Sequence, residues 1–149
     1  MKGLQNMKKA LIDTNVIIDY LDDRAPHADF AERLFDLCEQ EEFIGILTAS
    51  SITDIYYIMR KITGREKTLE SLKLLFSVFE VVEVNRNDLL RAMESTVADF
   101  EDALMAVCAK RVKADCIVTR NIRDFANSPV ATMTPEGFLA RFFPGADGE

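Results

Sequence analysis

The chain has 149 residues and a formal net charge of −7, with 48% hydrophobic and 29% charged residues. This length suits one domain with a real hydrophobic core, and the composition is that of a globular protein rather than a disordered one. Because no apolar run approaches the roughly 18 residues needed to cross a bilayer, we expect no membrane span.

We expect a single domain over residues 1–149, with a core of about residues 8–143 and a frayed tail at 144–149. The start of the chain has no signal-peptide core. Met7 is a second candidate start, in which case residues 1–6 are a leader. The three cysteines lie in apolar segments without CxxC spacing, which indicates reduced core thiols in a cytoplasmic protein.

Short apolar runs alternate with segments in which apolar residues recur at helical spacing. In chain order we predict a strand over 9–12, helices over 15–21 and 26–40, a strand over 44–48, helices over 50–62 and 66–77, a strand over 79–84, helices over 86–96 and 101–113, a strand over 115–119, a short strand over 130–133, and a last helix capped at 134–136. Thr14 or Asn15 should cap the first helix, Pro26 should begin the second, and Gly64 should end the third. Continuous apolar strands between helices predict a parallel sheet covered on both faces, which is the α/β class.

Acidic side chains occur where the predicted strands end or the predicted helices begin. The candidates are Asp13, Asp54, Asp99, Asp102 and Asp124, with Asn121 beside the last. Because the carboxyl ends of parallel strands share one edge of a sheet, these groups should converge there. Such a cluster repels itself unless a positive charge holds it, and a divalent metal ion is the simplest candidate.

Each acid also has a purely structural interpretation. Asp13 could cap a helix, but Thr14 and Asn15 can already do that, so we favour a functional Asp13. Asp99 and Asp102 share a helix face, and both suit the start of a helix. We favour Asp102 as the metal ligand and Asp99 as a cap or outer group.

The donor set is rich in oxygen, since His27 is the only histidine. Oxygen ligands select Mg²⁺ or Mn²⁺ over Zn²⁺. Clustered carboxylates that bind such ions are a device for phosphodiester cleavage. The predicted chemistry is therefore metal-assisted hydrolysis, although the acids alone leave a phosphatase or a DNA nuclease open.

The negative charge is unevenly distributed. Residues 19–42 hold nine acids and two bases, which accounts for the whole imbalance, whereas residues 58–73 carry a net +3. A polyanion could therefore meet a locally basic rim, although solvated helix faces explain the same pattern. The candidate RNA-binding side chains are Arg60, Lys61, Arg120 and Arg123.

Three segments together resemble the signatures of PIN-domain proteins: LIDTNVIIDYL at 11–21, DFEDALMAVCA at 99–109 and IVTRNIRDF at 117–125. The resemblance implies a three-layer α/β/α sandwich with a central, mostly parallel sheet of four or five strands. It also implies a ribonuclease site that depends on Mg²⁺ or Mn²⁺. Many bacterial and archaeal members are VapC-like toxins that cut RNA, are silenced by an antitoxin and commonly form homodimers.

On this resemblance, Asp13 matches the first family acid and Asp102 the third, the pair most closely tied to metal. Asp54 stands where the second acid is usually glutamate, so it is one methylene shorter. The fourth acid usually follows Thr119 by two residues, where this chain has Asn121. A full catalytic set would then be Asp13, Asp54, Asp102 and Asp124, supported by Thr14, Asn15, Asp99, Thr119 and Asn121.

The predicted function is a metal-dependent endoribonuclease, the toxin of a toxin–antitoxin pair. The altered second and fourth acids leave open a catalytically weak module that binds protein or RNA. The apolar faces at 30–38 and 56–59 could bind an antitoxin or a second subunit, but we favour the core for most of these residues.

Overall fold

The computed structural model describes residues 7–145, so the possible leader at 1–6 and the end of the predicted tail lie outside the described residues. Five strands form one sheet in the order β3-β2-β1-β4-β5, and every neighbouring pair is parallel. The strands are β1 (Lys9–Ile12), β2 (Ile44–Thr48), β3 (Glu80–Val82), β4 (Cys116–Val118) and β5 (Thr132–Met133). The prediction of a parallel α/β sheet is confirmed.

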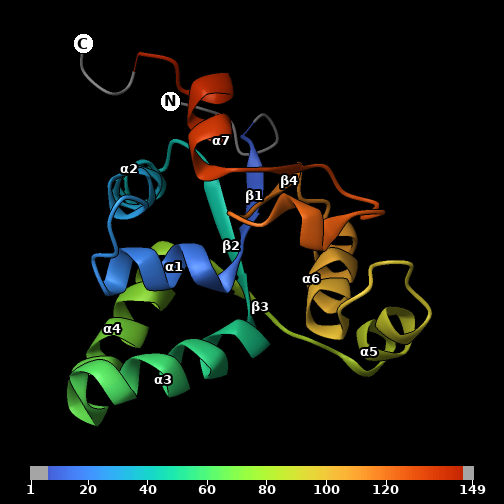
Figure 1. Cartoon of the computed structure of the whole chain (residues 1–149), viewed down its shortest axis with the longest axis horizontal. Coiled ribbons are helices and arrows are strands. Elements are labelled where there is room, and N and C mark those ends of the chain that lie inside the picture. The colour runs from blue at the N-terminus through green and yellow to red at the C-terminus, as the bar shows by residue number, and fades with distance from the viewer. Residues whose placement is uncertain (1–6, 146–149) are drawn as a thin grey trace.

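Helices cover both faces of this sheet (Figure 1). They are α1 (Thr14–Leu21), α2 (Ala28–Glu39), α3 (Ala49–Thr63), α4 (Arg65–Val78), α5 (Arg86–Met93), α6 (Phe100–Arg111) and α7 (Pro135–Phe142), with a 3-10 turn η2 (Ile122–Phe125) after β4. One core cluster joins the sheet to α1–α4 and α7, and a second joins it to α5 and α6. The three-layer α/β/α arrangement is therefore as predicted.

Strand β1 shows why its sequence is continuously apolar. Ala10 and Ile12 belong to the core on one face of the sheet, and Leu11 belongs to the core on the other. All three are at most 1% exposed. A strand buried on both faces has no solvent side on which a polar residue could alternate.

Several predicted boundaries were wrong. Asp13, rather than Thr14 or Asn15, is the N-cap residue of α1, although its side chain makes no capping hydrogen bond. Helix α2 begins at Ala28, so Pro26 precedes it rather than opening it. Strand β3 stops at Val82, and the chain reaches α5 through a capping box formed by Asn85 and Asp88.

Other expectations hold. Gly64 ends α3 with a φ of 87°, a left-handed conformation that favours glycine. Cys38, Cys108 and Cys116 are free and buried, as predicted for core thiols. Within residues 7–145, no helix is long and apolar enough to cross a membrane.

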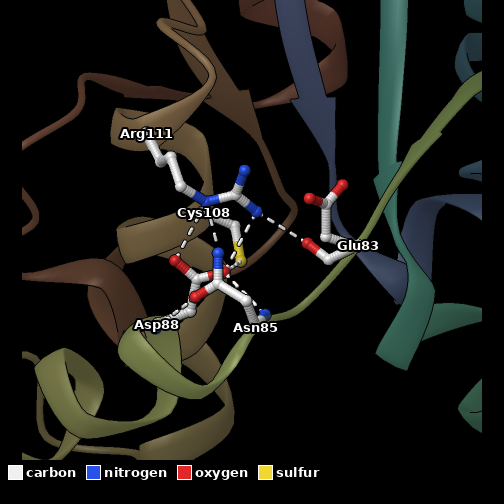
Figure 2. A network of polar contacts seen from close by, with 5 residues as sticks. All are labelled: Glu83, Asn85, Asp88, Cys108 and Arg111. Atoms are coloured by element: carbon white, nitrogen blue, oxygen red, sulfur yellow. Dashed lines mark hydrogen bonds and ion pairs between the residues drawn. The ribbon is translucent and has the colours of Figure 1, made fainter.

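A buried ion pair joins α5 to α6 (Figure 2). Asp88 is 1% exposed and accepts hydrogen bonds from Arg111 Nε at 3.0 and 3.2 Å, while Arg111 Nη2 also donates to the Glu83 carbonyl at 2.7 Å. Burial alone would raise the pKa of Asp88, but hydrogen bonds from Arg111 and the Asn85 backbone outweigh it and lower that pKa. The network fixes α5 against the carboxyl-terminal end of α6.

Candidate active site

The predicted acids converge at the carboxyl edge of the sheet, where Figure 1 shows the starts of α1, α3 and α6. A cavity of about 390 Å³ opens there. Its lining includes the predicted acids Asp13, Asp54, Asp102 and Asp124 and the predicted supporting residues Thr14, Asn15 and Asn121. Residues from four separate segments of the chain thus meet in one place.

Asp13 is fixed between β1 and β4. Its backbone N–H donates to the Val118 carbonyl at 2.9 Å, and its Oδ2 accepts a hydrogen bond from Thr119 Oγ1 at 2.8 Å. Thr119 Oγ1 in turn accepts from the Asn121 N–H at 3.0 Å. The carboxylate is only 6% exposed, and this burial raises its pKa although the Thr119 hydrogen bond opposes the shift. The hydrogen bond from Thr119 therefore holds the Asp13 carboxylate in one orientation at the wall of the cavity.

Asp102 lies in the first turn of α6. Asp99 is the N-cap of this helix, and its Oδ1 accepts a hydrogen bond from the Asp102 backbone N–H at 3.0 Å. Burial is the largest influence on the Asp102 carboxyl, followed by the negative charges of Asp99, Asp13, Asp124 and Glu101, and together they raise its pKa to about 7. A bound cation would therefore favour the deprotonated form of this side chain.

Asp54 and Asp124 complete the acidic lining together with Glu101, which the sequence analysis did not single out. Asp54 is half-buried on α3, and burial raises its pKa. Asp124 is exposed on η2, and its charge raises the pKa values of Asp13 and Asp102. It also lines an adjoining cavity of about 270 Å³ together with Asp99, Asp102 and Arg123.

Two hydroxyl residues that sequence reasoning missed join α1 to α3. Thr48 caps α3, its Oγ1 accepting from the Ser51 N–H at 3.2 Å. Ser51 Oγ lies 2.9 Å from Thr48 Oγ1 and accepts from Thr14 Oγ1 at 3.1 Å. The local signal for this cap is the polar run Thr48-Ala-Ser-Ser at the end of β2.

The predicted cations lie in different settings. Arg120 donates to Asp19 at 2.7 Å, and Asp19 is 1% exposed, so this guanidinium is fixed in a buried ion pair. Asp19 was also missed, although it is the second aspartate of the first motif. Arg60 lies over the ring of Tyr57 at 5.6 Å, and Lys61 is exposed beside it.

The cavity acids lack basic partners. Of the ion pairs recorded within residues 7–145, none involves Asp13, Asp54, Asp102 or Asp124. No group of three His, Cys, Asp or Glu side chains in this same part of the chain is arranged to hold a metal ion by itself. Mg²⁺, however, usually keeps several waters and needs only one or two carboxylates. The oxygen donors and uncompensated charge therefore fit a hydrated divalent ion.

The family model of the PIN domain matches residues 9–123. The chain belongs to the PIN-domain family. Its resemblance to PIN-domain signatures, read from three motifs, is thereby confirmed.

This PIN-domain protein is 25% identical over 142 residues to ribonuclease VapC1 of Aquifex aeolicus strain VF5, which covers 92% of this chain and 97% of that protein. Among solved structures, VapBC2 of Rickettsia felis bound to a promoter DNA fragment superposes with a TM-score of 0.67 at 17% identity, covering 85% of this chain and 98% of that one. VapC20 of Mycobacterium tuberculosis, a toxin that cleaves the sarcin–ricin loop, gives a TM-score of 0.61 at 13% identity, covering 72% and 86%. These structures share its fold.

Proposed function

We propose that this PIN-domain protein is a metal-dependent endoribonuclease, the toxin component of a toxin–antitoxin pair. The observation that carries the proposal is the convergence of uncompensated carboxylates in one cavity, with the pKa of Asp102 raised to about 7. Membership of the PIN family and similarity to a VapC ribonuclease support RNA as the substrate.

Asp13 and Asp102 are the residues proposed to hold Mg²⁺ or Mn²⁺, with Asp54 and Asp124 acting through water. When bound, the ion would supply an activated water and positive charge beside the scissile phosphate. Thr119 holds the Asp13 carboxylate in place, and Asp99 anchors the turn that carries Asp102. Asp102, whose pKa is raised to about 7, would hold such an ion in its deprotonated form.

The phosphate backbone of RNA needs basic contacts at the rim of this acidic cavity. Arg123 lines the adjoining cavity, and Arg60 and Lys61 lie on α3, so we propose these three as phosphate contacts. Arg120 is already paired with Asp19, so its proposed contribution is the positive charge that it places near Asp13.

The partners and the compartment belong to the same proposal. One structure of similar fold is a toxin–antitoxin complex from Klebsiella pneumoniae, and we propose an antitoxin and homodimerisation for this chain too. Exposed apolar side chains on α5, Leu90 at 42% and Met93 at 68%, offer a surface for such contacts. Three buried free thiols support a reducing, cytoplasmic setting.

The decisive experiment is cleavage of a panel of structured RNAs with Mg²⁺ or Mn²⁺ by the wild type, Asp13→Asn and Asp102→Asn. Each variant should lose activity by at least about a hundredfold, because metal-derived charge stabilisation is worth several kcal/mol. Asp29→Asn, an exposed acid on α2, is the matched control and should cleave normally. DNA and a phosphomonoester, tested as competing substrates, should remain uncut.

A catalytically weak binding module is the second candidate. One argument for it is that Asp54 is shorter than the glutamate usual at this position. Another is that no three His, Cys, Asp or Glu side chains within residues 7–145 are arranged to hold one metal ion. A folded wild type that binds RNA without cutting it at saturating Mn²⁺ would support this alternative. Cleavage that survives both Asp13→Asn and Asp102→Asn would contradict the proposed site.

A further inference from the structure

An exposed aromatic side chain shares the cavity with the acids. Tyr57, on α3, is 59% exposed and lines the cavity together with Asp13, Asp54 and Asp102. Ile58, beside it in the chain, is 37% exposed and lines the same cavity, so the two side chains give this wall an apolar contact surface. Whatever lies on this ring also lies beside the carboxylates.

Two cationic side chains lie next to the Tyr57 ring on the surface of α3. Asp54, Tyr57 and Lys61 are spaced i, i+3 and i+7, which places them on the same side of α3. The Arg60 guanidinium lies 5.6 Å from the centroid of the Tyr57 ring. Passing outward from the cavity, the surface of α3 thus changes from a carboxylate to an aromatic ring and then to two cations. The backbone of Tyr57 is only about 4.5 Å beyond that of Asp54 along the helix axis, at about 1.5 Å per residue.

The ring is also braced. Tyr56 packs edge-on against Tyr57, with ring centroids 5.3 Å apart and an interplanar angle of 81°. The start of α3 is tied to α1 through Ser51, which bonds both Thr48 and Thr14. A ring with few accessible orientations loses little entropy when a ligand stacks on it.

We propose that Tyr57 is a stacking platform for an unpaired nucleobase of the RNA strand at this site, with Arg60 and Lys61 contacting an adjacent phosphate. The proposal rests on the proposed ribonuclease function and assigns Tyr57 as the residue that positions the RNA strand beside the carboxylates. A ring beside two cations matches the alternation of bases and phosphates in a single strand. A base inside a duplex is already stacked and does not offer its face.

The chain has no tryptophan, so Tyr57→Trp would place a single tryptophan, which can be excited selectively, at the platform. Its fluorescence should be quenched when a short, mixed-sequence single-stranded RNA is added in Ca²⁺, chosen to limit cleavage, and should change little with the same RNA as a duplex. Phe76→Trp is the matched control, because Phe76 on α4 is 58% exposed and lies outside the cavity lining. It should show no quenching with either RNA.

Affinity gives a second readout, by anisotropy of the same RNA carrying a fluorescent label. Tyr57→Ala should weaken binding by roughly five- to 150-fold, the range of one aromatic–base stack, and Tyr57→Phe should bind like the wild type. In cleavage assays Tyr57→Ala should raise KM and leave kcat nearly unchanged, because stacking beside the reacting bond stabilises ground and transition states alike. Circular dichroism should show a folded Tyr57→Ala protein, since the side chain is mostly exposed.

Three outcomes would overturn the platform. Unchanged affinity and KM in Tyr57→Ala, in a protein whose wild type cleaves RNA, would refute the platform and leave the nuclease standing. Equal quenching of both tryptophan variants would indicate non-specific association. A Tyr57→Ala variant that loses self-association by light scattering but keeps RNA affinity would assign the ring to a second copy of the chain. Failure of the wild type to cut any RNA would instead refute the proposed function.

Discussion

Asp88 on α5 and Asp102 on α6 are two carboxyl groups at least partly buried in the fold, yet their pKa values move in opposite directions. Asp88 faces Arg111 and the Asn85 backbone, as Figure 2 shows, and its pKa is lowered. Asp102 faces other acids, and its pKa rises to about 7. Desolvation opposes the charged form at both places, so the neighbours decide the outcome.

The contrast separates structural acids from functional ones. At Asp88, and likewise at Asp19 with Arg120, the protein neutralises a buried charge with an arginine of its own. At the cavity, the recorded ion pairs of residues 7–145 leave Asp13 and Asp102 without such a partner. A charge left uncompensated inside a fold marks a position that something from outside is expected to neutralise.

Breaking the Asp88 pair should have the largest effect on stability. Asp88→Ala leaves Arg111 partly buried without its partner, and we expect the free energy of unfolding to fall by about 3–5 kcal/mol, towards the lower end because Arg111 is 27% exposed. Urea denaturation measures the loss. Asp22→Ala, which breaks the more exposed pair with Arg24, should change it by about 1 kcal/mol or less. Equal losses in the two variants would contradict the greater cost of breaking the more buried pair.

The pH dependence of stability should distinguish the two carboxyls next. The pKa of Asp102 is higher in the folded protein than in the unfolded chain, so the folded state holds the extra proton between about pH 4 and 7. In metal-free protein this group therefore makes stability fall as pH rises through that window. Asp88, with its lowered pKa, contributes stability that is lost as the pH falls below the ordinary carboxyl range.

Thermal unfolding in the presence of a chelator, from pH 4 to 8, measures this difference. Asp102→Asn should remove the fall in stability that this carboxyl causes as the pH rises. The Tm of the variant should therefore exceed that of the wild type by a margin that grows with pH. Mg²⁺ should raise the wild-type Tm more at pH 8 than at pH 5, because binding favours the folded, deprotonated site. Parallel Tm curves for the two proteins would show that Asp102 titrates normally.

The smallest effect is expected at Asp54. Its carboxylate is proposed to reach a metal only through water, so Asp54→Asn should weaken the apparent metal affinity by about tenfold, as for outer ligands. Asp54→Glu, which adds one methylene, should strengthen it. Titration of cleavage activity with Mn²⁺ tests both variants. If Asp54→Asn were as damaging as Asp102→Asn, Asp54 would have to be a direct ligand.

The strands that position the site could be predicted because strands buried on both faces are continuous apolar runs in the sequence. Ile44–Thr48 was placed without error, and Lys9–Ile12 likewise, since both are continuous apolar runs. The parallel order of such strands then brought distant acids to one edge. Asp13 and Asp102 could be proposed together although 89 positions separate them in the chain.

The sequence did not predict which charged side chains form ion pairs or which apolar side chains are exposed. The Asp19–Arg120 pair depends on how α1 packs near the end of β4, which no local pattern encodes. The segment 56–59 is apolar and was assigned mainly to the core. Met59 is indeed 2% exposed, but Tyr57 and Ile58 are 59% and 37% exposed. Helix α3, with 15 residues, is about 22 Å long and extends beyond the five-residue strand that precedes it.

The buried thiols are placed so that each side of the sheet can be monitored independently. Cys38 and Cys116 belong to the core shared by α1–α4 and α7, whereas Cys108 belongs to the core under α5 and α6. Burial raises the pKa of each to about 11, so an alkylating reagent reaches a reactive thiolate only after local opening. The labelling rates of these thiols would therefore reveal whether the two helical layers open together or one at a time.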